Sequence, residues 1–406
     1  MDRRTHSDAQ QPEKVGKLRT GHSRAHATLD SERKVAWNEY LKRSHAAALR
    51  GDLAWQEVTQ AGSAQALAAP GNRKEFELGS KVDAAWLDKA IQEKLPETII
   101  SYQTPTGGWS KAVDYSAGPR KLGMHWTSQS GKGWHYCGTL DNRSTTEQIR
   151  FLSMIVTHTN HVDCREAAVR GIRWLLDAQF PSGGWPQVYP LESGYHEAIT
   201  LNDGAMQHAL ELLIEIRSGE APFAWTKEDL REEAARAVER GLSCIFDSQI
   251  KIGDRTTVWC AQHGPITLAP VSARKKEPPS LSGGESAELV KFLMRTAPDS
   301  PRARNSIESA TTWFRSHVIV GKQLTKNAEG KSELVDADDK EAQLWARFYD
   351  LETEQPIFAG AQDGIVYDSF NEMAKHNKIA YDYFVTRPKE VIGKEYDRWK
   401  KRINKK

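Results

Sequence analysis

The chain has 406 residues, of which 39% are hydrophobic, so it can bury one large core in a single main domain. Its 56 Lys and Arg residues nearly balance 54 Asp and Glu residues, which gives a formal net charge of +2. This balance excludes the strong basic field typical of nucleic-acid-binding proteins, and no apolar run is long enough for a membrane helix. We therefore expect no nucleic-acid partner and no membrane partner.

The N-terminal part of the chain differs in composition from the rest. Residues 1–73 are expected to form an extension that precedes a main domain at 74–406. Residues 1–30 are polar and are predicted to be disordered, because they carry too few apolar side chains to offset the entropy of ordering. Residues 31–60 have helical periodicity, and residues 62–72 are predicted to be a linker.

Beyond residue 74 the pattern is mainly helical. Apolar residues in 201–217 follow the i, i+3, i+4 rule for one buried helix face. Ser144–Glu147 and Ser282–Glu285 each match the capping box that starts a helix. Strand-like alternation is scarce, so the sequence predicts an all-α fold.

A repeat is the clearest sign of internal organisation. Gln103-Thr-Pro-Thr-Gly-Gly-Trp109 recurs as Gln179-Phe-Pro-Ser-Gly-Gly-Trp185, and more loosely in the segment from Gln249 to Trp259. The nearly even spacing fits a unit of two helices plus loops. Three helix pairs in a ring would place the three loops on one rim. Alternatively, each copy is only a turn that ends a helix, with a tryptophan filling the core.

The four cysteines are far apart and form no Cys-x-x-Cys pair, which argues against a zinc site. They are Cys137, Cys164, Cys244 and Cys260. Buried thiols and one or two disulfides both remain open at this point. Residues 1–50 lack the apolar core of a secretory signal.

Two acidic and amide pairs stand at predicted loop-to-helix junctions: Asp141-Asn142 and Asn202-Asp203. Their oxygens could ligate a hard cation such as Ca²⁺, or could cap the helices that follow. A long irregular segment, 259–284, contains the basic run Arg274-Lys275-Lys276. Irregular connections of this length are often functional.

Taken together, separated motifs of this chain resemble those of the family 10 polysaccharide lyases, the pectate lyases with an α/α-toroid fold. The motifs are Gly-Gly-Trp109-Ser-Lys111, Thr139-Leu-Asp141-Asn142, Gly-Gly-Trp185-Pro-Gln, Leu201-Asn-Asp203-Gly, the segment 259–284 and Trp345-Ala-Arg347-Phe-Tyr-Asp. The likeness covers roughly residues 74–367. It implies an all-α (α/α)3-type toroid with long loops that form a substrate groove.

The resemblance also implies roles for individual residues. Arg274 would be the base, and Asp203, Asp141 and Asn142 would bind a Ca²⁺ cofactor. Substrate contacts are implied for Lys111, Trp109, Trp185, His263, Lys275 and Arg347. One departure is Gln362, which stands before Asp363-Gly where relatives commonly have arginine, so that one charge-assisted contact would be missing.

The implied reaction is cleavage of α-1,4-polygalacturonate (pectate) by Ca-assisted anti-β-elimination, which leaves 4,5-unsaturated oligogalacturonides. Calcium would neutralise the carboxylate beside the C5 proton that Arg274 removes. Because a guanidinium normally stays protonated, Ca²⁺ and Lys275 or Lys276 would have to favour its neutral form, and activity should rise into the alkaline range. Such an enzyme is expected to be secreted or periplasmic and to be a monomer.

Two other interpretations are weighed against the lyase. Terpene cyclases and prenyltransferases repeat a similar Gln-Gly-Trp motif in α/α toroids, but they need an apolar cavity with an Asp-x-Asp-Asp acid or a zinc site, and neither is evident. A catalytically weakened pectin-binding protein would keep the groove without cleavage, and Gln362 is the only sequence feature that favours it.

Overall fold

In the computed structural model, the residues described are 20–60, 67–72, 76–79, 81–128, 137–297, 299–379 and 381–405. The chain divides into two compact units. The first comprises 1–181, 185–197 and 208–238, and the second comprises 182–184, 198–207 and 239–406.

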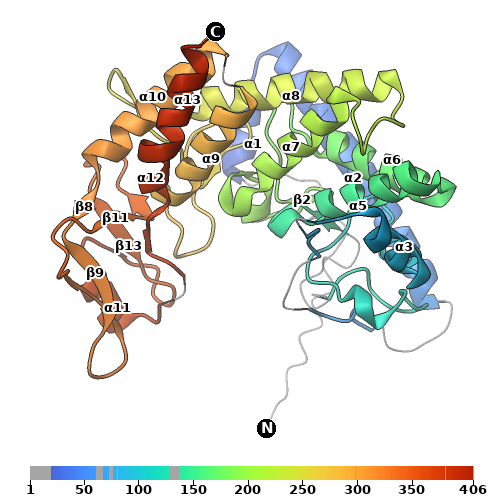
Figure 1. The fold of residues 1–406 in the computed structure, drawn as a ribbon, viewed down its shortest axis with the longest axis horizontal. Coiled ribbons are helices and arrows are strands. Elements are labelled where there is room, and N and C mark those ends of the chain that lie inside the picture. The colour runs from blue at the N-terminus through green and yellow to red at the C-terminus, as the bar shows by residue number, and fades with distance from the viewer. Residues whose placement is uncertain are drawn as a thin grey trace. The chain divides into compact units, whose positions relative to one another are not determined.

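The first unit is built mainly from helices (Figure 1). Complete within it are α1 (Thr20–Ala27), α2 (Ser31–Gln60), α3 (Ala84–Gln92), α4 (Leu95–Ser101), α5 (Thr146–Thr159) and α6 (Val162–Ala178), and it includes parts of α7 (Ala205–Ser218) and α8 (Glu228–Ser248). Strands β1 (Gly138–Thr139) and β2 (Val188–Tyr189) pair antiparallel. Helices α2 and α7 confirm the helical periodicity of 31–60 and 201–217.

Within residues 1–30, which are predicted to be disordered, Thr20–Ala27 form α1. Residues 1–19, and residues 61–66 of the linker region, lie outside the described part of the chain. Within the predicted linker, Leu67 forms an isolated β-bridge to Met124, and Gly71 forms one to Val113. The part of the linker that is described therefore runs against the main body of its unit.

The second unit mixes helices with short strands (Figure 1). Its helices are α9 (Gly283–Thr296), α10 (Pro301–Ser316), α11 (Phe370–His376), α12 (Arg387–Glu390) and α13 (Tyr396–Ile403). Its strands are β3 (Ile199–Thr200), β4 (Lys251–Ile252), β5 (Arg255–Thr256), β6 (Gln262–His263), β7 (Leu281–Ser282), β8 (Ile319–Val320), β9 (Lys322–Lys326), β10 (Ser332–Asp336), β11 (Gln343–Ala346), β12 (Phe348–Tyr349), β13 (Pro356–Ala359), β14 (Val366–Tyr367) and β15 (Phe384–Val385).

These strands overturn the predicted all-α fold, since the described residues are 50% helical and 13% strand, with several sheets. One sheet has the order β14-β13-β12-β7, in which Phe348 lies opposite both Ile357 and Ser282. Another has the order β15-β11-β8, and β9 and β10 form a hairpin. These strands span only two to five residues, and β3, β6, β7 and β12 are buried throughout, so they lack the alternation that reveals a strand in a sequence.

Of the two predicted capping boxes, one forms in part and the other does not form. Ser282 caps α9 by accepting a hydrogen bond from the backbone N–H of Glu285 (3.3 Å). Ser144 does not cap α5, whose N-cap residue is Thr145. The Thr145 hydroxyl instead donates to Trp109 O (3.0 Å) and accepts from Trp109 N (2.9 Å). A tertiary contact thus replaces the local cap.

The glutamine–tryptophan repeat corresponds to a repeated hydrogen-bond pattern. Each indole N–H donates to a carbonyl of the preceding helix: Trp109 to Ile99 (2.8 Å), Trp185 to Leu175 (2.9 Å) and Trp259 to Ile245 (2.7 Å). Each glutamine amide donates to a carbonyl of the next helix hairpin: Gln103 to Ala167 (2.9 Å), Gln179 to Ala237 (2.8 Å) and Gln249 to Ser306 (3.1 Å). The repeat therefore joins successive helices.

All four cysteines are buried free thiols, which settles the alternative between thiols and disulfides. Cys137 Sγ lies 3.6 Å from Glu192 Oε1 in the first unit. Every helix formed by the described residues is too short or too polar to cross a bilayer.

Candidate active site

Arg274 is fixed by a carboxylate three residues along the chain. A tight turn, closed by the hydrogen bond from Glu277 N to Arg274 O (2.8 Å), brings the two side chains together. Arg274 Nε donates to Glu277 Oε2 at 2.8 Å, and Nη2 donates to Oε1. The Arg274 side chain keeps 47% of its surface exposed, whereas that of Glu277 keeps 9%. Arg274 is thus partly exposed to solvent, while the carboxylate that binds it, Glu277, is buried.

Charge and burial have opposite effects on the pKa of the Glu277 carboxyl group. Burial is the largest single influence and raises its pKa, but the hydrogen bonds and charge of Arg274, together with the charge of Arg347, bring the pKa below its ordinary value. Glu277 is therefore ionised at neutral pH. A charged carboxylate in this position orients the guanidinium and also stabilises its protonated form.

Lys276 lies between two other cations and an aromatic ring. Its Nζ is 4.3 Å from the centroid of the Tyr381 ring, and the Tyr381 hydroxyl donates to Lys276 O. Burial, followed by the charges of Arg274 and Arg347, lowers the pKa of Lys276, although Glu277 opposes this. The structure therefore gathers three cations, Arg274, Lys276 and Arg347, in one part of the second unit.

Arg347 is held on several sides. Its Nη2 donates to Asn202 Oδ1 (3.0 Å) and to Glu285 Oε1 (2.5 Å), and its guanidinium carbon is 4.8 Å from the centroid of the Tyr381 ring. Asn202 Nδ2 in turn donates to Asp203 Oδ2 (2.9 Å). Contacts thus run from Asp203 through Arg347 and Tyr381 to Lys276, next to Arg274. The predicted base acts on this network through its charge, which lowers the pKa of Lys276.

The predicted site residues of the first unit form their own group. Lys111 Nζ is bonded to Asp141 Oδ2, while Asp141 Oδ1 is buried and has no hydrogen-bond partner among the described residues. Asn142 follows with φ 50° and Asp203 of the second unit has φ 53°, a left-handed conformation that Asn and Asp tolerate better than most residues. Asn142 does not N-cap α5, whose N-cap residue is Thr145.

Two basic residues occupy equivalent positions after a buried tryptophan. Lys111 follows Trp109 by two residues and contacts Asp141, the first residue of the turn Asp141–Arg143. Arg347 follows Trp345 by the same interval and contacts Asn202, the first residue of the turn Asn202–Gly204. A buried indole thus anchors each short segment that carries a cation.

Three predicted substrate contacts have packing roles here. Trp109 and Trp185 are 0% exposed, so neither offers a ring face to a sugar. His263 is also 0% exposed; its Nδ1 is 2.8 Å from Leu268 O, and its Nε2 accepts from Cys260 N (3.1 Å). Burial lowers the pKa of His263 to about 4, so it is neutral and organises its loop. Lys275, in contrast, is exposed and lies close to Gly364.

Sequence reasoning missed several partners of these cations. Glu277 was detectable, because a glutamate three residues after an arginine can reach it across a turn. Glu285 was assigned only to a capping box, yet it also binds Arg347. Tyr381 lies far along the chain from Lys276 and Arg347 and carries no local signal.

No cluster of three or more His, Cys, Asp or Glu side chains suited to a metal ion occurs within the part of the chain that is described. Any calcium ligation must therefore draw on few carboxylates, supplemented by amide, carbonyl or substrate oxygens. The unpartnered, buried oxygen of Asp141 is the donor that best fits such an ion.

Comparison with known proteins identifies the family. Residues 103–392 match the family model described as pectic acid lyase. Two structures of the family 10 polysaccharide lyase from Cellvibrio cellulosa are similar to this chain. One, an aspartate-to-alanine mutant in complex with trigalacturonic acid, is 27% identical with a TM-score of 0.63, and the match covers 77% of this chain and 96% of that chain. The other is 28% identical with a TM-score of 0.64, covering 77% and 95%.

None of the curated proteins matches the chain. The family match nevertheless spans well over half of it, including Arg274, Glu277 and Arg347. The chain therefore belongs to the pectic acid lyase family and is a polysaccharide lyase.

Proposed function

We propose that this enzyme is a pectate lyase that cleaves α-1,4-polygalacturonate by β-elimination, with Arg274 as the base. The observation that carries the proposal is the group of Arg274, Lys276 and Arg347, held by Glu277, Glu285 and Tyr381. Several fixed cations suit a substrate with a carboxylate on every sugar. The similar lyase from Cellvibrio cellulosa was solved with trigalacturonic acid, which supports the same substrate class here.

In the proposed reaction, Arg274 accepts the proton from C5 of the galacturonate. The electron pair of the C–H bond forms the C4=C5 double bond, and the C4–O4 bond breaks with its electrons on O4. A proton from solvent neutralises O4, and Arg274 later returns its proton to solvent, so no water is consumed. Arg347 and Lys276 bind the anionic sugar, and Glu277 orients Arg274.

Arg274 must lose a proton before it can act, and its pair with Glu277 opposes this. The cations Lys276 and Arg347 act in the opposite direction, because positive charges nearby disfavour a protonated guanidinium. This balance favours an enzyme that works best in alkaline solution, where the neutral form of the base is more populated.

Calcium is the cofactor we propose, and Asp141 and Asn142 of the first unit are the ligands we propose for it. The donor chemistry fits, since Asp141 Oδ1 is a buried oxygen without a partner and hard oxygen donors are those that Ca²⁺ prefers. When bound, calcium would neutralise the uronate carboxylate and so make the C5 proton easier to remove. A polymer substrate found outside cells is consistent with a secreted or periplasmic, monomeric enzyme.

Replacing Arg274 by alanine tests the proposed base. Turnover of polygalacturonate should fall by about a thousandfold, in the range for a lost general base, while retention on immobilised polygalacturonate persists. Arg255→Ala is the matched control, because Arg255 is also an exposed arginine paired with a glutamate of the second unit, Glu354. Substantial turnover by Arg274→Ala would reject this role, and retention of the wild-type protein without turnover would favour the pectin-binding interpretation.

A further inference from the structure

A basic pocket of about 520 Å³ lies in the second unit between the β9–β10 hairpin and the end of α11. Four lysines and one histidine line it: Lys326, Lys331, Lys375, His376 and Lys378. Within the described part of the chain, no aspartate or glutamate lines this pocket. All five basic side chains are exposed, so a ligand can reach them from solvent.

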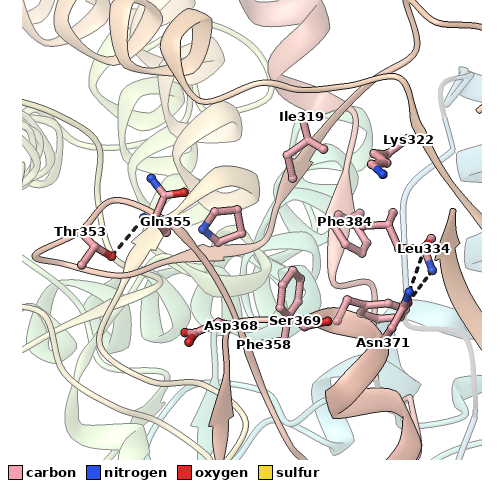
Figure 2. Close-up of a pocket in the computed structure, with 12 residues that line it drawn as sticks. Ile319, Lys322, Leu334, Thr353, Gln355, Phe358, Asp368, Ser369, Asn371 and Phe384 are labelled. Carbon is pink, nitrogen blue, oxygen red and sulfur yellow. Dashed lines mark hydrogen bonds between the residues drawn. The ribbon is translucent and has the colours of Figure 1, made fainter. Parts of the chain in front are cut away.

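The two walls of the pocket are joined by an asparagine. Asn371 of α11 accepts a hydrogen bond from Leu334 N (2.8 Å) and donates to Leu334 O (3.0 Å) on β10. Figure 2, a view of the adjoining pocket, shows these bonds as dashed lines between Asn371 and Leu334. The hairpin is therefore held in register with the helix, which fixes the spacing of the cations on each wall.

The floor of the pocket is also ordered by hydrogen bonds. The buried side chain of Asn377 accepts from Gln362 N (3.0 Å) and donates to Asp363 Oδ2 (2.8 Å). Gln362 Oε1 accepts from Lys378 N (2.9 Å). The backbone beneath Lys378 is thus fixed, so the flexible part is the lysine side chain.

Nearby acids neutralise only part of this charge. Lys331 pairs with Glu329 (3.1 Å), and Lys375 pairs with Glu372 (2.6 Å). Lys326 Nζ instead donates to the Ser332 hydroxyl (2.8 Å). Exposed ion pairs of this kind are weak and exchange readily for other anions. The pocket therefore retains an excess of positive charge toward an incoming anion.

A second depression, of about 250 Å³, shares part of its lining with the basic pocket. It shares Lys326, Ser332 and Ile379 with the basic pocket and is also lined by Tyr381. Tyr381 is the ring that contacts both Lys276 and Arg347. Tyr381 thus belongs both to this depression and to the group of cations beside Arg274, and the charged residues that line the depression are Lys326 and Asp382.

We propose that the basic pocket is a remote subsite that binds carboxylates of the polyuronate chain, several sugars away from the bond that is cleaved. This inference rests on the proposed function and assigns Lys326 and Lys378 to polymer binding. Compact ammonium groups on flexible stems suit carboxylates whose positions vary along a chain. The subsite would favour long substrates, because a short oligosaccharide that fills the active site would not reach it.

The double variant Lys326→Gln/Lys378→Gln tests the subsite. We expect the KM for polygalacturonate to rise by about tenfold, as two weak charge-assisted contacts are lost, with kcat and the KM for trigalacturonate unchanged. The increase should shrink at high salt, where exposed charges are screened. Lys322→Gln is the control: it removes the same charge from β9, but Lys322 pairs with Asp336 (2.6 Å) and lines the adjoining pocket (Figure 2).

Equal KM values for the double variant and the Lys322→Gln control would overturn the proposal. A rise in the KM for trigalacturonate as large as the rise for polygalacturonate would also overturn it. Failure of the proposed function would appear differently, as wild-type protein that forms no unsaturated product. In that event, retardation of the wild type and the double variant in gels containing polygalacturonate still decides the matter: weaker retardation of the double variant supports the subsite, and equal retardation rejects it.

Discussion

Glu277 binds the side chain of Arg274 through two hydrogen bonds, with Nε to Oε2 at 2.8 Å, and also accepts from the Arg274 backbone N–H at 3.2 Å. This arrangement fixes the orientation of the guanidinium but also favours its protonated, charged form. The proposed base thus depends on a partner that both orients and restrains it.

Glu277→Gln separates these two effects. Glutamine keeps a side-chain oxygen that can orient Arg274 but removes the negative charge. The increase of rate with pH should therefore occur about one pH unit lower, and the maximal rate should fall by about tenfold. The measurement is kcat/KM for polygalacturonate across neutral and alkaline pH. Glu390→Gln, which removes an exposed glutamate paired with Lys291, is the control. An unchanged profile in Glu277→Gln would exclude this electrostatic role.

Asp141→Asn should weaken calcium binding, because the buried carboxylate oxygen without a hydrogen-bond partner belongs to this side chain. We expect a loss of affinity of about tenfold or more, measured by calorimetric titration with Ca²⁺, and loss of wild-type activity on adding EDTA. Asp88→Asn, at an exposed aspartate of the same unit, should bind as the wild type does. If Asp141→Asn and Asp88→Asn bind calcium equally, Asp141 is not a ligand.

Glu192 should make stability depend on pH. Burial raises the pKa of Glu192 to about 7, from 4.5, so the folded state keeps a proton that the unfolded chain releases. The free energy of unfolding therefore falls as pH rises from about 4.5 through 7, and the loss of stability is complete above about pH 7. Glu192→Gln should be more stable than the wild type by about 2 kcal/mol at pH 9, but not at pH 4.

Urea unfolding at both pH values measures this difference. Glu93→Gln is the control, since that side chain is 62% exposed and should change stability little at either pH. A stabilisation by Glu192→Gln that is the same at pH 4 and pH 9 would show that Glu192 does not titrate between the folded and unfolded states as proposed.

Gly183 should tolerate no side chain. Its φ is +94°, and an added Cβ would lie 2.2 Å from the carbonyl oxygen of Arg240. Gly183→Ala should therefore destabilise the protein by about 3 kcal/mol or more. Gly253→Ala separates strain from clash, because Gly253 has φ +58° with open space around it and should cost only about 1 kcal/mol. Equal losses of thermal stability in the two variants would argue against the predicted clash.

The helices and the repeat could be predicted because they leave periodic signals. The apolar spacing of 201–217 gave α7, and the glutamine–tryptophan motifs mark the turns that join successive helices. The strands could not be predicted in this way. β12 and β13, for example, have buried residues in succession, and their pairing depends on partners distant in sequence, such as Ser282.

The contacts of the predicted site residues could be foreseen only in part, for similar reasons. Arg274 and Arg347 lie in motifs that resemble a known family, but their partners Glu285 and Tyr381 come from other segments that only the fold brings close. Exposure is equally hard to foresee. Trp185 and His263 carry chemistry suited to sugars, yet both are fully buried.

The most direct test of elimination is to incubate the protein with polygalacturonate and follow ultraviolet absorbance and bond cleavage together, in isotopically labelled water. We predict that new absorbance from C4=C5 double bonds matches the number of bonds cut, with no oxygen from water in the products. Cleavage without absorbance, accompanied by incorporation of labelled oxygen, would show hydrolysis and contradict the proposed lyase mechanism.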